Sequence, residues 1–397
     1  MGIVDDRSSR IDGIVCFAGV DWWYHNRGHS ECQIMRRLAR KLPVLWINSI
    51  GMRMPTPGKS ELVLRRYARK LRSTLQGLKR DECGLWVYSP LFLPRYTEWA
   101  TALNGVALDW QVRLLTRRLG MERPGLWITI PTAAAAAERG PWERIAFNRS
   151  DAFSEFPEVD SETIRGFEER LLALSDDVLY VSEELMEQER DRTYRAHLVP
   201  HGVEFDHFAA SRSEFGPALP VPERIANLPR PIVGFYGALD DYTVDLGLMV
   251  RSARSIPDGT LLVIGPQAME IGPLLAEPNV AYLGPIAYEE LPAYAAQFDV
   301  GVMPWLQNEW IEKCNPIKLR EYLALGFPIV STHFPELAKY AEHVYAAADH
   351  DAFVAQLGRA LEEHSPERNK ARRESVRNES WDSRADRVAE ILGLDSD

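Results

Sequence analysis

The feature that most constrains the fold is an alternation of short apolar runs with helical patterns, which restarts after residue 230. The first set of apolar runs lies at 13–19, 44–48, 84–89, 125–130, 144–148 and 178–182, with helical patterns such as 31–41 and 162–174 between them. The second set lies at 232–237, 261–265, 280–284, 300–304 and 328–332. Because this alternation is typical of doubly wound parallel sheets, we expect an α/β protein of two Rossmann-like domains.

The two sets are separated by a stretch with six prolines between residues 200 and 231, a composition typical of a linker. A length of 397 residues also fits two domains of ordinary size. We therefore expect an N-terminal domain over 1–205 and a C-terminal domain over 206–380. A final amphipathic helix over 381–397, with Trp381, Val388, Ile391 and Leu392 on its apolar side, either ends the second domain or crosses back to the first.

The composition excludes several classes of protein. Hydrophobic residues make up 46% and charged residues 26%, as in globular proteins with full cores. No apolar run approaches the ~20 residues that span a bilayer, and the polar start of the chain is not a secretory signal. The four cysteines lack CxxC spacing, which indicates a reduced compartment. We expect a cytoplasmic protein.

The net charge of −11 is unevenly distributed. Residues 1–150 contain 24 Lys+Arg and 13 Asp+Glu, a balance of +11, whereas residues 151–397 contain 22 and 44, a balance of −22. A basic part on an otherwise acidic chain indicates a partner that is local and anionic.

The stretch "CNPIKLREYLALGFPIVS" (314–331) places a charged pair at a helix start. Asn315 is expected to cap the helix, with Pro316 as its first residue and Gly326 at its end. The free amides there, including that of Ile317, and the cation of Lys318 suit a phosphate, while Glu321 lies one turn along the same face. In open α/β sheets ligands bind beyond the carboxyl ends of strands, where this helix begins. The alternative is an ordinary surface pair of Lys318 with Glu321.

A resemblance of this stretch, and of three others, to a known family supports a phosphate-binding site over a surface ion pair. "NPIKLREYLALGFPIVST" closely resembles the nucleotide-sugar motif of GT-B glycosyltransferases, in particular bacterial enzymes that build cell-surface polysaccharides, such as teichuronic acid enzymes and the xanthan glucuronosyltransferase. "VPHGVEFDHF" (199–208), "VAYLGPIAYEELPAYAAQFDVGVMPW" (280–305) and the terminal "SWDSRADRV" fit the same pattern. The resemblance covers most of the second domain and, more loosely, the first. It implies a GT-B fold, with two Rossmann-like domains facing a cleft.

The resemblance also implies roles for residues of the second domain. Glu321 would hold the nucleotide ribose and Lys318 the diphosphate. Pro285 and Ile286 would lie beside the base, and Gly237 would occupy the turn that faces the phosphates.

The sequence departs from the family at two places. Many retaining members carry a Glu where Lys313 stands here, and many carry a basic pair in the region that reads "GALDDYTVD". A retaining mechanism is therefore not assumed, and Lys318 is expected to be the principal cation on the leaving diphosphate. We expect no metal, because the DxD motif at 395–397 is terminal and Asp240 and Asp241 fit a turn.

The first domain should supply the base that an inverting transfer needs. The candidate is Asp151, three residues after the expected strand 144–148, in a place where the resembling enzymes carry an acidic cluster. The alternative is that Asp151 caps the next helix. Glu155 is the reserve candidate, and Arg149 is close enough to pair with either.

The loop after the first strand, "AGVDWWYHNRGHSE" (18–31), is expected to line the cleft on the acceptor side. Its aromatic rings could stack on sugar faces and its polar groups could bond sugar hydroxyls; the residues are Asp21, Trp22, Trp23, His25, Arg27 and His29. Asp21 is an outside candidate for the base. His25 and His29 lack the context of a metal site.

The densest basic stretch is 58–82, which has eight Lys or Arg and one Glu between Lys59 and Arg80. One interpretation is an interfacial helix that binds anionic lipid through Arg65, Arg66, Arg69 and Lys70. The alternative is a surface helix with a solvated basic face, and nucleic acid fits less well because no recognition motif accompanies the patch.

Together these patterns predict a glycosyltransferase that uses a UDP-sugar without metal or other cofactor. The acceptor is expected to be a hydroxyl of a lipid-linked or polymeric glycan, and the enzyme a peripheral protein on the inner face of the cell membrane. An epimerase or hydrolase of the same fold, or a non-catalytic subunit that binds a sugar nucleotide, is the alternative.

Overall fold

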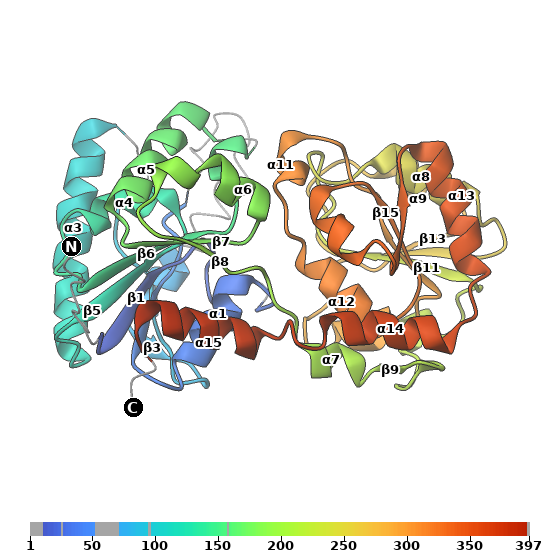
Figure 1. Cartoon of the computed structure of the whole chain (residues 1–397), viewed down its shortest axis with the longest axis horizontal. Helices are drawn as coiled ribbons and strands as arrows, with labels where there is room; N and C mark the ends of the chain where they lie inside the picture. Colours follow the sequence, from blue (N-terminus) through green and yellow to red (C-terminus); the bar gives the residue numbers. More distant parts are fainter. Residues whose placement is uncertain (1–10, 25–26, 52–70, 94–96, 157–158, 395–397) are drawn as a thin grey trace, which may run out of the picture. The chain divides into compact units, whose positions relative to one another are not determined.

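The computed structural model describes residues 11–24, 27–51, 71–93, 97–156 and 159–394. The chain forms two compact units (Figure 1). The N-terminal unit comprises Met1–Pro200 and Arg384–Asp397, and the C-terminal unit comprises His201–Ser383. His25 and the basic side chains Arg65, Arg66, Arg69 and Lys70 lie outside the described residues.

The N-terminal unit is built on an eight-stranded sheet in the order β3-β4-β2-β1-β5-β6-β7-β8, parallel except for the β3–β4 pair. Its strands are β1 Gly13–Phe17, β2 Val44–Ile47, β3 Lys79–Arg80, β4 Trp86–Tyr88, β5 Pro124–Ile128, β6 Arg144–Arg149, β7 Asp177–Tyr180 and β8 Ala196–Leu198. Its helices are α1 Ser30–Leu38, α3 Glu98–Arg118, α4 Ala134–Ala137, α5 Ser161–Leu174 and α6 Glu183–Gln188, with short 3₁₀ turns at Pro131–Ala133, Phe153–Glu155 and Arg190–Arg192.

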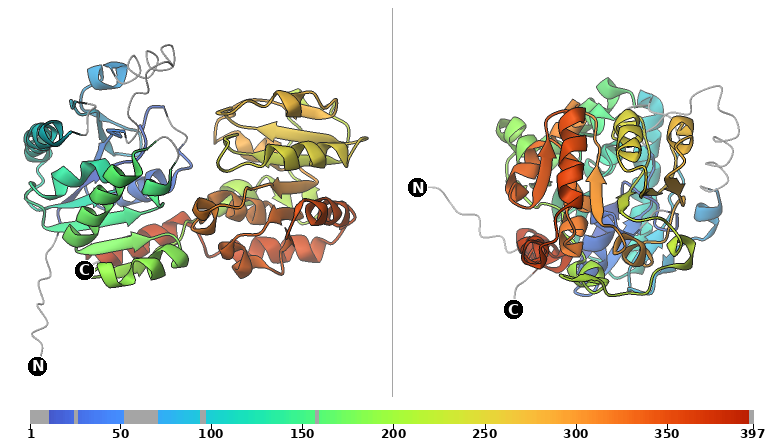
Figure 2. Two further views of the ribbon diagram at one scale, coloured as in Figure 1. Left: turned by 90° about the horizontal axis from the view of Figure 1, so that it is seen from above. Right: turned by 90° about the vertical axis from the view of Figure 1, so that its right-hand side faces the viewer.

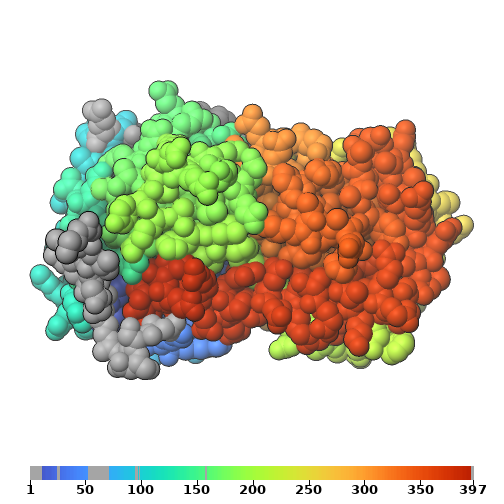
Figure 3. All heavy atoms as spheres, in the orientation of Figure 1, coloured from blue at the N-terminus to red at the C-terminus, as the bar shows by residue number. Residues whose placement is uncertain are grey.

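Alternate residues of the central strands divide the N-terminal core into two layers. Val15, Phe17, Leu45 and Ile47 pack with residues of α3, α4 and α5 in one cluster. Their strand neighbours point to the opposite face because side chains alternate along a strand. The last helix, α15 Trp381–Leu392, returns to this unit, where Asp386 pairs with Lys41 at 3.1 Å. Figure 3 shows this helix at the molecular surface.

The C-terminal unit has a six-stranded parallel sheet in the order β13-β12-β11-β14-β15-β16. Its strands are β11 Ile232–Tyr236, β12 Thr260–Ile264, β13 Val280–Tyr282, β14 Val300–Met303, β15 Ile329–Thr332 and β16 Val344–Ala347, and a small hairpin pairs β9 Arg212–Ser213 with β10 Gly216–Pro217. Its helices are α7 Phe205–Ala209, α8 Leu246–Arg254, α9 Gly272–Leu275, α10 Leu291–Ala295, α11 Glu309–Glu312, α12 Ile317–Leu325, α13 His350–Leu361 and α14 Pro366–Val376, with 3₁₀ turns at Glu223–Ile225 and Pro335–Tyr340.

Helices cover both faces of this sheet (Figure 2). One cluster joins the sheet to α7, α10, α12 and α14, and a second joins the other face to α8, α9 and α13. The strand order 3-2-1-4-5-6 is that of a doubly wound sheet, whose order reverses between β11 and β14.

Most strands predicted from the sequence are confirmed, as are helices α1, α5 and α15. The prediction of a linker after residue 200 is wrong for 205–217, which forms α7 and the β9–β10 hairpin with Phe205 and Phe208 buried in the C-terminal core. Among the residues described, no helix is both long and apolar enough to cross a bilayer.

Candidate active site

The clearest site in the C-terminal unit lies where the strand order reverses. There β11 ends at Tyr236, followed by Gly237, and β14 ends at Met303, followed by Pro304 and Trp305. In open α/β sheets the crevice beyond these two strand ends is the usual ligand position. Helix α12 brings the Lys318 side chain to this position, with its Nζ atom 4.1 Å from the centre of the Phe235 ring and 5.8 Å from that of Trp305.

Gly237 makes room for the lysine. Its φ of +144° lies in a region that side chains disfavour, and a Cβ atom there would clash with Lys318 Nζ. Burial lowers the Lys318 pKa from 10.5 to about 8, against the opposing effect of Glu321 and Asp240. The lysine is therefore a partly desolvated cation in close contact with a backbone turn.

The neighbouring cation on α12 is neutralised, whereas Lys318 is not. The buried Arg320 pairs with Glu336 at 2.8 Å and with Glu379 at 2.7 Å, and it donates to Asn315 Oδ1 at 2.6 Å. Among the described residues Lys318 has no acidic oxygen within ion-pair distance. The alternative of an ordinary surface Lys–Glu pair is therefore wrong.

Glu321 lies one turn further along α12 and is only 5% exposed. Its Oε2 accepts a hydrogen bond from Tyr236 at 2.8 Å and its Oε1 accepts one from Tyr288 at 3.3 Å. Burial raises its pKa from 4.5 to about 7, while the two tyrosines and Lys318 lower it. Sequence reasoning missed both tyrosines, although Tyr236 directly precedes Gly237 and Tyr288 follows the predicted base-binding segment.

The start of α12 differs from the prediction by one residue. Pro316 occupies the cap position and Ile317 is the first helical residue, without a side-chain cap. The expectation that Asn315 caps the helix is wrong, because its side chain accepts from Arg320 instead. Gly326 ends the helix with φ +85°, as predicted. Pro285 and Ile286 follow β13, just after Gly284, whose carbonyl accepts from Gly265 N.

In the N-terminal unit, Asp151 follows β6 and does not cap a helix. The following 3₁₀ turn is capped by Ala152 without a side-chain bond, and α5 is capped by Asp160, whose carboxylate accepts from Thr163 N at 3.0 Å. Burial raises the Asp151 pKa from 3.8 to about 7; Arg149 opposes this and Glu31 adds to it. The capping alternative is therefore wrong for Asp151.

Arg149 is buried and holds the main chain at Asp151. It is 3% exposed and pairs with Glu168 at 2.5 Å and Glu189 at 2.9 Å. Its Nη1 also donates to the main-chain carbonyl of Asp151 at 2.5 Å. Arg149 thus fixes the backbone of the β6–α5 loop, and its charge lies close enough to Asp151 to lower the pKa of that carboxyl.

Glu31, which sequence reasoning missed, lies close enough to Asp151 to raise its pKa. It lies in the first turn of α1, is 4% exposed and accepts hydrogen bonds from the amides of Gly19 and Val20 at 3.1 Å. Burial raises its own pKa from 4.5 to about 7, which the bonds from Thr129, Gly19 and Val20 oppose. Acidic residues in the first turn of a helix are common, so nothing in the sequence separates Glu31 from a surface residue.

The loop at 18–31 is shaped by its own side chains. Trp22 is 3% exposed and packs edge-on against Trp46, so the expectation that it stacks on a sugar is wrong. Asp21 accepts from Trp23 N and from Ser73 Oγ, each at 3.1 Å, which fixes the turn. The remaining predicted residues are Trp23, which is half-buried beneath Lys79; Arg27, which pairs with Asp81 at 3.5 Å; and His29, which is exposed before α1.

Among the residues described, no three His, Cys, Asp or Glu side chains are grouped so as to hold a metal ion. Asp240 accepts from the Thr243 amide at 2.8 Å, as expected of a turn residue. The described side chains therefore offer a partly desolvated cation at Lys318, a buried carboxyl at Glu321 and, in the N-terminal unit, two carboxyls with raised pKa values.

Comparisons with known proteins agree with this geometry. The model of the family Glycosyl transferases group 1 matches residues 230–363, which include Gly237, Lys318 and Glu321. The putative teichuronic acid biosynthesis glycosyltransferase TuaH of Bacillus subtilis (strain 168) is 27% identical over 297 residues, which cover 69% of this chain and 72% of that protein.

Among solved structures, sucrose-phosphate synthase of Thermosynechococcus elongatus has a TM-score of 0.71 at 16% identity, covering 96% of this chain and 98% of that one. The E. coli trehalose-6-phosphate protein bound with UDP-2-fluoro glucose has a TM-score of 0.67 at 14% identity, covering 96% and 99%. Anabaena HepE, solved in complex with UDP and glucose, has a TM-score of 0.66 at 12% identity, also covering 96% and 99%.

The two doubly wound units thus define the class: the chain has the GT-B fold of glycosyltransferases. Within that class, residues 230–363 form a glycosyl transferases group 1 domain, and the protein is a glycosyltransferase similar to the teichuronic acid enzyme.

Proposed function

We propose that the C-terminal unit binds a UDP-sugar through α12, with the diphosphate at Lys318 and Gly237 and the ribose at Glu321. The observation that carries the proposal is the partly buried Lys318, which has no ion-pair partner among the described residues while Arg320 beside it has two. A desolvated cation next to a glycine turn and a helix N-terminus favours an anionic ligand. Complexes of HepE with UDP and of the E. coli protein with a UDP-sugar support the choice of nucleotide.

The departing UDP would be stabilised without a metal. Its negative charge would develop beside Lys318 and the first amides of α12, from Ile317 onward, which are positioned before the reaction begins. The main chain at Pro285 and Ile286 would lie beside the base.

The N-terminal unit would supply the base. Asp151 has a pKa of about 7, which suits proton transfer from a sugar hydroxyl at neutral pH. Trp23, Arg27 and His29 remain candidates for contact with the acceptor. The similarity to a teichuronic acid enzyme supports a polymeric glycan as acceptor. The proposal extends to a lipid-linked form of the glycan, reached from the inner face of the cell membrane by a peripheral protein.

UDP affinity tests the donor site. Removing a charge-assisted contact costs ~1.5–3 kcal/mol, so Lys318→Ala and Glu321→Ala should each weaken UDP binding roughly ten- to hundredfold. Calorimetric titration with UDP would measure this, with Lys370→Ala, an exposed lysine of α14, as the matched control. Unchanged affinity in both site variants would remove the assignment. A screen of nucleotide-sugars by thermal shift, followed by assays of donor hydrolysis, would identify the donor.

A further inference from the structure

Helix α3 of the N-terminal unit is apolar on both its buried and its exposed sides. Leu108, Val112 and Leu115 face the core. On the opposite side five large apolar side chains are more than half exposed: Trp99 58%, Leu103 51%, Val106 54%, Trp110 67% and Leu114 54%. A helix with large apolar side chains on two opposite sides normally packs on both, so this face lacks a cover in the described part of the chain.

The five residues form one continuous stripe. Their spacing of four, three, four and four residues keeps them on one side of a helix with 3.6 residues per turn, over about 22 Å from Trp99 to Leu114. Figures 1 and 2 place α3 at the outer edge of the N-terminal unit, beside the sheet. We call these residues the α3 stripe.

Two exposed leucines, Leu91 and Leu93, lie along one edge of the α3 stripe, and side chains of α3 fix their main chain by hydrogen bonds. The side chain of Asn104 exchanges hydrogen bonds with the main chain of Leu93, at 2.7 and 2.8 Å, and Gln111 does the same with Leu91, at 2.9 Å each. Leu91 is thereby held 64% exposed and Leu93 40% exposed. The whole apolar surface is on the order of several hundred Å², comparable with the largest patches of monomers, which are often functional.

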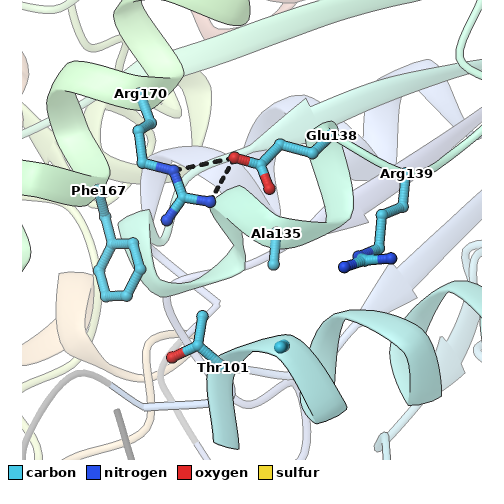
Figure 4. Close-up of a pocket in the computed structure, with 7 residues that line it drawn as sticks. Thr101, Ala135, Glu138, Arg139, Phe167 and Arg170 are labelled. Carbon is cyan, nitrogen blue, oxygen red and sulfur yellow. Dashed lines mark hydrogen bonds and ion pairs between the residues drawn. The ribbon is translucent and has the colours of Figure 1, made fainter. Parts of the chain in front are cut away.

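The other edge of the α3 stripe and its C-terminal end are basic. A cavity of about 350 Å³ opens between α3, α4 and α5, with the Arg139 side chain pointing into it and Arg170 paired with Glu138 (Figure 4). Arg117 and Arg118 end the helix. Within the described residues, the side chains of Arg117, Arg118 and Arg139 have no acidic partner, whereas Arg113 is paired with Asp109.

We propose that the α3 stripe is a docking surface for an anionic phospholipid bilayer. Tryptophans are favoured at the membrane interface, and an apolar face bordered by arginines is the pattern of a helix that lies in that interface. The unpaired arginines at the edge match the phosphates of the lipid headgroups, each contributing within a Debye length of the surface. A second copy of the chain fits less well, because Asp109, the acidic side chain described along this face, is already paired.

This proposal rests on the proposed function and deepens it, because it names the surface through which the peripheral protein meets the membrane. The donor site lies in the other unit, so lipid binding and UDP binding are independent measurements. If the protein does not bind lipid, the proposed UDP site is unaffected, and if it does not bind UDP, the proposed lipid surface is unaffected.

Vesicle sedimentation of the full chain tests the proposal. Wild-type protein should sediment with vesicles of phosphatidylcholine and phosphatidylglycerol, less with phosphatidylcholine alone, and less at high salt. The variant Trp99→Ser with Trp110→Ser should lower the partition coefficient about tenfold or more. Phe215→Ser with Leu275→Ser, two exposed apolar residues of the C-terminal unit, is the matched control and should bind as wild type does.

A second variant keeps the test independent of the tryptophans. Arg117→Glu with Arg118→Glu leaves the α3 stripe intact and should reduce binding to the anionic vesicles but not to the neutral ones. Melting temperatures and circular dichroism should match wild type in every variant. Three results would overturn the proposal: equal binding to both kinds of vesicle, binding that survives loss of both tryptophans, or a dimer in sedimentation velocity that the tryptophan variant dissociates.

Discussion

Glu321→Gln should make the C-terminal unit more stable while it weakens UDP binding. The substitution keeps the size of the side chain, and the amide can still hydrogen-bond the hydroxyls of Tyr236 and Tyr288, which contact the carboxylate at 2.8 and 3.3 Å. What it removes is a negative charge in a site that is 5% exposed. The Glu321 charge destabilises the folded state, and a function that needs this charge, here UDP binding, explains its presence.

The size of the effect follows from the pKa. Burial raises the Glu321 pKa from 4.5 to about 7, so ionising this group costs the folded state about 3 kcal/mol relative to the unfolded state. The folded state holds the proton more tightly, so wild-type stability falls as pH rises from about 4.5 to 7. Because loss of the carboxylate also leaves Lys318 without its nearest opposite charge, we expect a net gain of ~1–3 kcal/mol at pH 8 and little gain at pH 5.

Hydrogen exchange measured on peptides from β11 and α12 would follow this unit alone. Such a gain corresponds to a rise of roughly 2–10 °C in its melting temperature. UDP affinity should fall about tenfold or more in the same variant, measured by calorimetric titration. A variant that is less stable than wild type at pH 8, or a difference that is equal at pH 5 and pH 8, would refute the account of Glu321 as a buried, ionisable ligand.

Two further predictions concern the glycine turn and the base. Gly237→Ala should displace Lys318 and lower UDP affinity about tenfold; Gly216→Ala, which has a similar φ of +135° but open space around it, controls for backbone strain, and equal affinities of the two variants would contradict the prediction. Asp151→Asn should lower turnover by ~10²–10⁴ without lowering the melting temperature, because Asp151 caps no helix; preserved turnover with a lower melting temperature would make it structural.

The sequence predicts those parts of the site that depend on local pattern. The strand ends, the start of α12 and the facing positions of Lys318 and Glu321 follow from periodicity, from Pro316 and Gly326, and from helix geometry. The doubly wound sheets follow in the same way from the alternation of apolar runs. These features need only residues that are close in the chain.

The partners of the site residues could not be predicted, because they are distant in the chain. Glu321 receives its hydrogen bonds from residues 85 and 33 positions earlier. Arg320 and Lys318 look alike in the sequence, and only the tertiary positions of Glu336 and Glu379 neutralise the first and not the second. The burial of Trp22 was missed for the same reason, since Trp46 belongs to the next strand.

The carboxyls of Glu31 and Asp151 in the N-terminal unit are not equivalent, although both have pKa values raised to about 7. Glu31 accepts hydrogen bonds from two backbone amides, which stabilise its anion. The carboxylate of Asp151 receives none that is comparable among the described residues, and the negative charge of Glu31 raises its pKa further. Both carboxyls therefore titrate in the same range, with the anion of Glu31 held by the backbone and that of Asp151 held only by the charge of Arg149. Glu31 thus fixes the main chain at Gly19 and Val20 and adds to the effect of burial, which raises the Asp151 pKa to near neutrality, where a base both loses and accepts a proton readily.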